Sequence, residues 1–174
     1  MRKNIFVALD FSNFDKALDV ANSVKDYAAG LKITNELFSI IGKDGLKKLS
    51  SFGLDIFLDL KLLDVPNTVK KTVASIESLK TVKYLTVHTS GGHDMLKSAN
   101  EAAKELELLG VTILTSQSAS KEQVLTLANL AIKSGIKGVI SSAQEYESVR
   151  SLSKDLKIFC PGIRDEKGNK HDQK

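Results

Sequence analysis

Residues 55–64 read DIFLDLKLLD, a run in which charged and apolar side chains alternate. Successive side chains point to opposite faces of a β-strand, so Phe57, Asp59 and Lys61 share one face. The other face carries only aliphatic side chains, those of Ile56, Leu58 and Leu60. The aliphatic face is expected to pack against helices, which leaves Asp59 and Lys61 pointing into the interior, where charge is costly unless it is paired. The run therefore predicts a strand that carries an internal ion pair.

Similar β-type runs recur along the chain, and longer segments with helical spacing of apolar residues separate them. The seven predicted strands are Ile5–Leu9, Leu31–Ile33, Ile56–Lys61, Tyr84–His88, Val111–Leu114, Gly138–Ile140 and Lys157–Cys160. After the first strand, Ser12 or Asn13 is available as the N-cap of a helix. Before the fifth strand, one helical stripe is predicted from Met95, Ala99, Ala102, Leu106 and Leu109. This alternation predicts a chain of βα units.

Successive βα units build either a doubly wound sheet or a closed (β/α)₈ barrel. No glycine-rich dinucleotide fingerprint follows the first strand, which argues against the open sheet. Polar residues follow almost every predicted strand, namely Asp10, Lys32, Asp59 with Lys61, His88, Thr115, Ser141 and Arg164. In a barrel these residues would converge on the face where the βα loops build the active site. We therefore predict an α/β protein of the TIM-barrel type.

The chain has 174 residues, the length of one ordinary domain. A (β/α)₈ barrel typically needs about 250 residues, and no eighth βα unit follows the last predicted strand. We therefore expect residues 1–174 to form a single barrel domain that is incomplete at its C-terminal end. Either the chain is a true fragment, or it belongs to a longer protein.

Composition narrows the class of protein further. The chain is 42% hydrophobic and 26% charged, as expected for a folded domain, and its net charge of +4 comes from lysines spread along the sequence. Nucleic acid is therefore not an expected partner. No apolar run reaches the length of a membrane span, and the N-terminal apolar run meets Asp10 rather than a cleavage site. With Cys160 as its single cysteine, the protein is expected to be cytoplasmic and independent of disulfides.

The predicted ion pair has a structural and a functional interpretation. A single Asp-Lys pair on a strand fits a structural filling of the barrel as well as it fits a site. Lys32 and Asp10 end two other strands on the same predicted face, so an alternating array of lysines and carboxylates becomes possible. Such arrays occur at functional sites more often than they serve stability alone. The functional interpretation is therefore favoured.

Residues 57–69 read FLDLKLLDVPNTV and resemble the Asp-x-Lys-x-x-Asp-[Ile/Val]-Pro-Asn-Thr signature of the orotidine 5′-phosphate decarboxylase family. Further matches follow in order: VALD at 7–10, LK at 31–32, VHTSGG at 87–92, LTS at 114–116, SAQE at 142–145, PGIR at 161–164 and DQK at 172–174. The resemblance covers the whole chain, and it is strongest to the bacterial branch.

The resemblance implies a cofactor-independent decarboxylation of orotidine 5′-phosphate to UMP in pyrimidine biosynthesis. In this family Lys61 would protonate the C6 carbanion, and Asp59 would lie near the substrate carboxylate. Lys32 would pair with the catalytic carboxylate and reach the ribose, and Asp64 would be contributed across a two-fold interface to the partner's site. The resemblance therefore also implies a homodimer.

The remaining positions that the resemblance marks would bind substrate. Asp10 matches a carboxylate that binds the ribose hydroxyls, and Thr68 would join Asp64 in the partner's site. The other matched positions are Asn67 in the signature, Thr115 after the fifth strand, and Arg164 and Gln173 in the phosphate grip. A Gly-Arg pair expected after the eighth strand is absent. Structural alternatives stay open, because Asp10 and Thr68 are also suited to capping helices and Thr115 to satisfying a loop backbone.

Two other functions remain possible. One is a metal-dependent sugar-phosphate decarboxylase of the same superfamily, which shares the DxKxxD motif but carries an acidic metal ligand near the position of Lys32. The other is a non-catalytic barrel fragment. His88 and His93 lack a third ligand at metal-site spacing, so no metal is predicted.

Overall fold

The structure is a computed structural model that describes residues 4–114 and 120–163. Its strands are β1 (Phe6–Leu9), β2 (Gly30–Thr34), β3 (Asp55–Leu62), β4 (Tyr84–His88), β5 (Glu107–Val111), β6 (Gly138–Ile140) and β7 (Lys157–Phe159). Its α-helices are α1 (Phe14–Val24), α2 (Asn35–Ser50), α3 (Pro66–Glu77), α4 (Gly92–Ala102), α5 (Lys121–Lys133) and α6 (Tyr146–Arg150). Two 3₁₀ helices, η1 (Thr89–Gly91) and η2 (Ala143–Glu145), follow β4 and β6.

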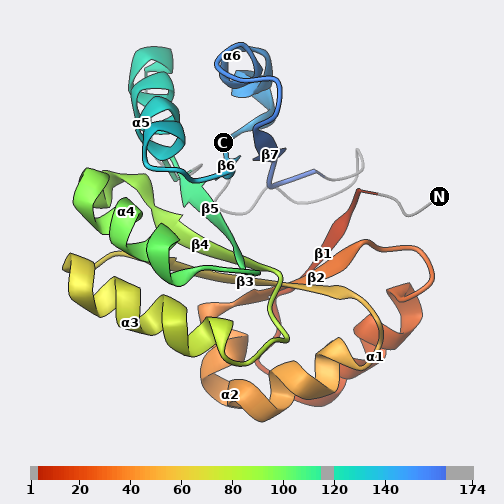
Figure 1. The fold of residues 1–174 in the computed structure, drawn as a ribbon. Helices are drawn as coiled ribbons and strands as arrows, with labels where there is room; N and C mark the ends of the chain where they lie inside the picture. Colours follow the sequence, from red (N-terminus) through yellow and green to blue (C-terminus); the bar gives the residue numbers. More distant parts are fainter. Residues whose placement is uncertain (1–3, 115–119, 164–174) are drawn as a thin grey trace.

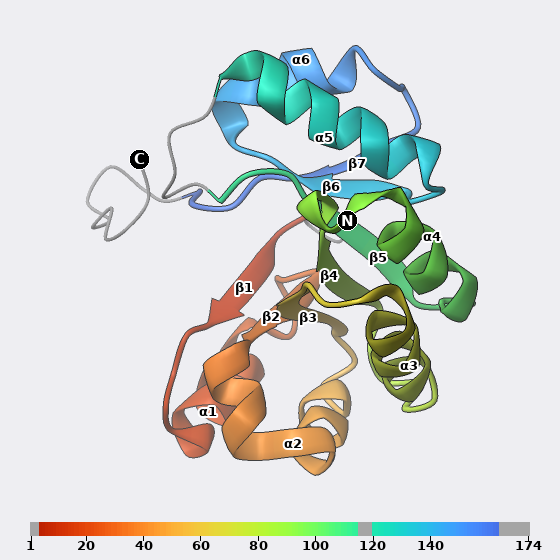
Figure 2. The same ribbon diagram turned by 90° about the vertical axis from the view of Figure 1, so that its left-hand side faces the viewer.

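The strands form one seven-stranded sheet in which each strand pairs in parallel with the next along the chain. Figures 1 and 2 show that this sheet curls, with the helices on its outer side. The predicted alternation of strands and helices is therefore confirmed as a curled parallel sheet. Within the described ranges, β1 and β7 are the two ends of the sheet. The closed eight-stranded barrel stays a prediction.

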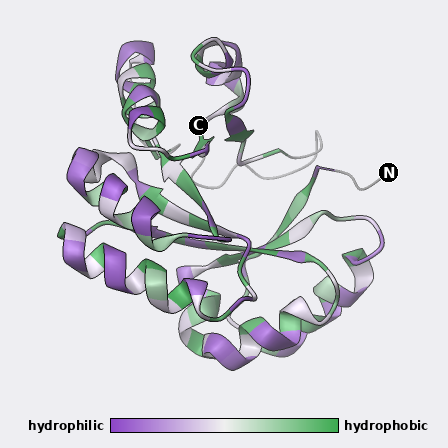
Figure 3. Cartoon of the chain, in the orientation of Figure 1, coloured by the Kyte–Doolittle hydropathy of each residue, from purple (hydrophilic) through white to green (hydrophobic). Residues whose placement is uncertain are grey.

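Local sequence signals account for the helix starts. The Asn13 side chain caps α1 by accepting a hydrogen bond from the Lys16 N–H at 3.1 Å, as predicted for one of two candidate residues. Helix α3 begins with Pro66, whose fixed φ and missing N–H suit the first turn. Hydrophilic and hydrophobic residues share each helix in Figure 3, as expected of helices with one face on a sheet. In the described part of the chain, no helix is both long enough and apolar enough to cross a membrane.

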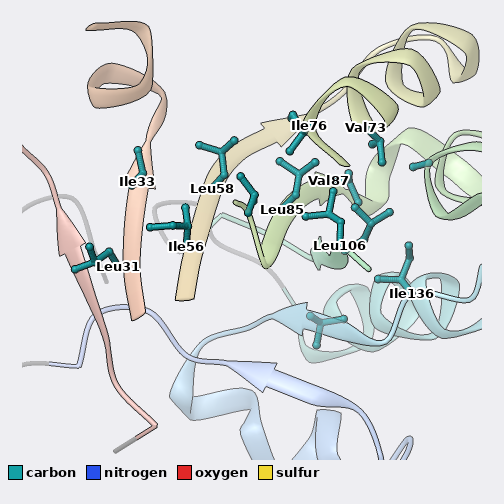
Figure 4. Packing of buried hydrophobic residues seen from close by; sticks show 14 of the residues in the cluster. Leu31, Ile33, Ile56, Leu58, Val73, Ile76, Leu85, Val87, Leu106 and Ile136 are labelled. Carbon is teal, nitrogen blue, oxygen red and sulfur yellow. The ribbon is translucent and has the colours of Figure 1, made fainter. Parts of the chain in front are cut away.

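The sheet separates two apolar clusters. The larger one lies between the sheet and the helices and includes the aliphatic side of β3, with Ile56 and Leu58 fully or almost fully buried (Figure 4). The smaller one fills the concave side with the rings of Phe6, Phe57, Tyr84 and Phe159, whose centroids lie 5.1–6.3 Å apart. Phe57 therefore points inward and the aliphatic residues outward, as the alternation along residues 55–64 predicts.

The predicted position of the fifth strand was wrong. The expected strand at Val111–Leu114 lies instead at Glu107–Val111, and α4 ends at Ala102 rather than running on to Leu109. The carboxylate of Glu77 explains the difference, because it accepts hydrogen bonds from the backbone N–H groups of residues 104–106 and holds them outside any helix. The leucines at helical spacing in this segment also alternate with glutamates, and the strand period prevailed.

Candidate active site

Four charged side chains meet at the carboxyl ends of the first three strands. Asp10 follows β1 directly, Lys32 lies in β2, and Asp59 and Lys61 lie in β3. Parallel strands bring their carboxyl ends to one edge of the sheet, so residues distant in sequence converge there. We call Asp10, Lys32, Asp59 and Lys61 the strand-end cluster. The sequence predicted each of them as a site residue.

Asp59 lies at the centre of the strand-end cluster and is only 8% exposed. Its Oδ2 accepts a hydrogen bond from Lys61 Nζ at 2.7 Å, and Lys32 Nζ lies 3.8 Å from the same oxygen. Lys32 Nζ is also 3.5 Å from Oδ1 of Asp10, whose side chain is largely exposed. The result is an alternating chain of carboxylate, ammonium, carboxylate and ammonium. The pairing offsets the cost of burying Asp59.

A β-bulge directs Lys61 toward Asp59. The register between β3 and β4 shifts between Leu58 and Leu62, where four steps along β3 correspond to two along β4. Lys61 lies within this bulge at a φ of 50°, in the left-handed region that residues with a Cβ rarely adopt. Backbone strain of this kind persists only where surrounding contacts hold it, and it occurs often at functional sites.

The side chain of Thr86 in β4 supplies two of those contacts. Its Oγ1 accepts a hydrogen bond from the Lys61 backbone N–H at 2.8 Å and donates one to Oδ1 of Asp59, also at 2.8 Å. Thr86 is fully buried. One hydroxyl therefore connects the strained residue of the bulge with the central carboxylate.

His88 lies beside the strand-end cluster at the end of β4 and is half-buried. Burial lowers its pKa, and the positive charge of Lys61 lowers it further, while Asp59 opposes the shift. The imidazole is therefore mostly neutral at pH 7. A neutral ring adds no third positive charge to a cluster that already holds two ammonium groups.

The signature residues after β3 surround the start of α3. Asp64 is exposed, and its Oδ1 accepts a hydrogen bond from the Val65 N–H at 2.6 Å. Helix α3 starts at Pro66, so Asn67 and Thr68 occupy its first turn and neither is the N-cap. The capping alternatives for Thr68 and Asp10 are therefore wrong: Val65 precedes α3, and Asn13 caps α1.

Three predicted substrate-binding residues, Thr115, Arg164 and Gln173, lie outside the described residues. Within the described ranges, no group of three or more His, Cys, Asp or Glu side chains is arranged to hold a metal ion. His93, one of the two histidines weighed as ligands, pairs instead through Nδ1 with Ser134 Oγ at 2.9 Å.

Residues 3–174 match the model of the Orotidine 5'-phosphate decarboxylase / HUMPS family. The chain belongs to this family. A relative named orotidine 5'-phosphate decarboxylase, from Wolbachia pipientis, is 41% identical over 184 aligned positions that cover 98% of this chain and 80% of the relative. A second relative of that name, from Sphingopyxis alaskensis, is 37% identical and matches 100% of this chain and 83% of its own.

A solved structure supports the assignment to the orotidine 5'-phosphate decarboxylase / HUMPS family. The crystal structure of orotidine 5'-phosphate decarboxylase from Lactobacillus acidophilus is similar to this chain with a TM-score of 0.83 and 34% identity. The match covers 93% of this chain and 82% of that one. The resemblance found in residues 57–69 is thus confirmed at the level of the family and of the curled sheet.

Thr86 contacts two residues of the strand-end cluster, but it is not among the site residues predicted from the sequence. A signal was present, because Tyr84, Thr86 and His88 alternate with Leu85 and Val87 along β4. That alternation predicts a polar inner face for β4 as clearly as it does for β3. A threonine in a strand does not by itself indicate a site, because threonine is common in strands for reasons of packing alone.

Proposed function

We propose that this chain decarboxylates orotidine 5′-phosphate to UMP without a cofactor, through the strand-end cluster. The observation that carries the proposal is the contact of Lys61 Nζ with the buried carboxylate of Asp59 at 2.7 Å, in a chain of this family. Membership of the family supports the activity, and the strand-end cluster contains the ammonium group that the reaction needs.

The reaction breaks the bond between C6 and the carboxylate, so that CO₂ leaves and the electron pair stays on C6. No adjacent group of the pyrimidine accepts this charge, and the protein must stabilise it. A fixed ammonium in a site with little water does so far better than solvent. Lys61 supplies that ammonium and donates one of its protons to C6, which completes UMP. The neutral amine then regains a proton from water.

Asp59 and Lys32 position the proton donor. Asp59 anchors Lys61 Nζ through a charge-assisted hydrogen bond. Lys32 contacts both Asp59 and Asp10, so it ties the reacting end of the cluster to its exposed end. We infer that Asp10, whose side chain is 64% exposed, binds the ribose hydroxyls together with Lys32. Thr115 would contact the substrate, and Arg164 and Gln173 would bind its phosphate, as the resemblance implies.

Replacement of Lys61 by alanine tests the proposal directly. We expect the wild-type protein to remove orotidine 5′-phosphate, followed by its absorbance, and Lys61→Ala to lower kcat by at least about 10³-fold, because both charge stabilisation and proton donation are lost. Lys157→Ala is the matched control, since Lys157 lies at the start of β7 and pairs with Glu107 instead. Turnover by Lys61→Ala at the wild-type rate would refute the role of Lys61.

We further propose that the protein acts as a homodimer in which Asp64, Asn67 and Thr68 reach the partner's substrate. Leu63 and Val65 flank Asp64 and are 56% and 63% exposed, which offers apolar surface for a partner to bury. Their position beside an exposed carboxylate matches the arrangement that the resemblance implies. A cytoplasmic location fits such a biosynthetic enzyme.

Mixing two inactive variants tests the shared site. Lys61→Ala and Asp64→Ala proteins are each expected to be nearly inactive. When they are unfolded together and refolded, about half of the dimers are mixed, and each mixed dimer carries one site with both residues intact. We expect activity to return to about a quarter of the wild-type level per site. No recovery, in a mixture shown by mass spectrometry to contain mixed dimers, would place Asp64 in its own subunit's site.

The metal-dependent sugar-phosphate decarboxylase is the weaker alternative. Lys32 occupies the position near which that relative carries an acidic metal ligand, and a cation bound at Asp59 would meet two lysine ammonium groups that already lie within 3.8 Å of its Oδ2. A divalent ion there would be repelled by both. Activity toward a sugar phosphate that disappears with EDTA and returns with a divalent metal would favour this alternative.

A further inference from the structure

We propose that Thr86 is a positioning residue that orients the Asp59 carboxylate and holds the bulge that aims Lys61. This inference rests on the proposed function and adds to it a residue that does not touch the reacting atoms. One buried hydroxyl contacts both members of the central ion pair, Asp59 and Lys61.

The direction of each hydrogen bond follows from the chemistry of the groups. The Lys61 backbone N–H can only donate, so the Thr86 oxygen accepts from it at 2.8 Å. A threonine hydroxyl has one proton to give. That proton therefore goes to Oδ1 of Asp59, which accepts it at 2.8 Å. Thr86 thus orients the carboxylate of Asp59.

The two oxygens of Asp59 have separate partners. Oδ1 accepts from Thr86, and Oδ2 faces Lys61 Nζ at 2.7 Å and Lys32 Nζ at 3.8 Å. Without Thr86, the lysines are the only described side chains that hold the carboxylate, and both are long and flexible. Rotation of the carboxylate would then move Lys61 Nζ away from its position.

The hydrogen bond from the Lys61 backbone N–H to Thr86 also helps to position the Lys61 ammonium, through the backbone of that residue. Where β3 bulges, the Lys61 N–H has lost regular strand pairing, and the Thr86 side chain takes the place of a β4 carbonyl as its acceptor. This bond holds Lys61 at its positive φ of 50°. The start and the tip of the Lys61 side chain are therefore both fixed by contacts that lead to Thr86.

Two substitutions separate the hydroxyl from the volume of the side chain. Thr86→Val keeps the shape and removes both hydrogen bonds, whereas Thr86→Ser keeps the hydroxyl and removes a methyl group. We expect Thr86→Val to lower kcat by about 10- to 100-fold with KM changed by less than about threefold, since a displaced reacting group costs rate more than binding. Thr86→Ser is expected to keep kcat within about threefold of wild type.

Thr89→Val is the matched control. Thr89 is also fully buried, and its hydroxyl donates to the Val111 carbonyl at 2.7 Å, outside the ion pairs. The same substitution there should lower the melting temperature as Thr86→Val does but leave kcat within about threefold of wild type. Equal losses of kcat in the two valine variants, or in Thr86→Ser and Thr86→Val, would overturn the proposal and show a purely structural role.

A measurement without substrate distinguishes failure of this inference from failure of the proposed function. If the wild-type protein does not decarboxylate orotidine 5′-phosphate, the proposed function fails. The coupling between Thr86 and Asp59 can still be measured by urea unfolding of Thr86→Val, Asp59→Ala and the double variant. We expect the double variant to unfold less readily than the product of the two single effects predicts, by about fivefold or more in the unfolding constant. If the effects of the two single substitutions on the unfolding constant simply multiply in the double variant, Thr86 and Asp59 are not coupled and the inference is overturned.

Discussion

One cluster of ion pairs lies at the starts of the parallel strands and another lies at their ends, and the two clusters differ. At the strand starts, Glu107 of β5 pairs with Lys157 of β7 and with Lys83, whose Nζ lies 3.4 Å away. We call Glu107, Lys83, Lys157 and the adjacent Tyr84 the strand-start cluster. At the strand ends, Asp59 pairs with Lys61 and Lys32. Each end thus has one carboxylate between two lysines.

In the strand-start cluster, the charged groups pair with one another. Burial raises the pKa of Glu107, but the hydrogen bond and charge of Lys157 and the charge of Lys83 outweigh it, and the net pKa is lowered. Its hydrogen bond to Glu107 raises the pKa of Lys157 in return, and Lys157 also lies 5.6 Å from the centroid of the Tyr84 ring. Each group has its partner within the protein, so the cluster favours the folded state.

The strand-end cluster, which we propose binds the substrate, has a different geometry. It includes a strained backbone at Lys61 and a central carboxylate held by Thr86, and it opens to solvent through Asp10. In the strand-start cluster, by contrast, no residue has a positive φ, although its lysines are nearly half exposed. The difference teaches that neither the number of ion pairs nor their exposure identifies a site; backbone strain, and a buried hydroxyl that holds both the strained residue and the central carboxylate, mark the candidate site.

Among the substitutions that compare the two clusters, Asp59→Asn at the strand ends is expected to have the largest effect. The amide keeps the shape but removes the charge that anchors Lys61, so kcat should fall by about 10²-fold or more. Steady-state kinetics on the purified variant would measure this. Glu107→Gln makes the same chemical change at the strand starts and should leave kcat within about threefold. Comparable losses of kcat in both variants would remove the functional distinction between the two ends.

A smaller effect, on stability, is expected at Glu77, which supports the strand-start end from α3. Burial opposes ionisation of Glu77, but hydrogen bonds from Lys80 and the backbone N–H groups of residues 104–106 lower its pKa from 4.5 to about 2. The stabilisation is therefore present above pH 4.5 and is lost as the pH falls toward 2. Glu77→Gln should cost about 2 kcal/mol at pH 7.

Urea unfolding at several pH values would test the effect of Glu77. The difference in unfolding free energy between wild type and Glu77→Gln should shrink steadily between pH 4.5 and pH 2. A difference that stays constant over that range would show that the charge of Glu77 is not what stabilises this end.

The smallest expected effect is the loss of folding stability caused by Glu107→Gln. Its carboxylate side chain is 20% exposed, so solvent screens its pairs, and the substitution should cost about 1 kcal/mol. Thermal unfolding at low and high salt would measure this loss, which should decrease as salt screens the pairs. A loss that does not depend on salt would indicate that packing around Tyr84, rather than charge, holds this end together.

The sequence predicted much of the fold and the four charged residues of the strand-end cluster, but not Thr86. Alternation along residues 55–64 was enough to orient Phe57, and capping chemistry was enough to narrow the N-cap of α1 to Ser12 or Asn13, of which Asn13 is the one used. The fifth strand was misplaced because its leucines fit both periods, and the decision came from Glu77, 27 residues before Lys104. A contact between distant residues cannot be inferred from spacing.

The sequence by itself determined the order of strands and helices, the inward face of β3 and the family, because these depend on residue types at short, regular intervals. Only the tertiary structure decided that Lys32 lies 3.8 Å from Asp59, that a bulge turns Lys61 to a positive φ, and that Thr86 connects the two. The physical reason is that hydrogen bonds and ion pairs depend on distance in space. The curl of the sheet sets that distance, and no single stretch of the chain contains it.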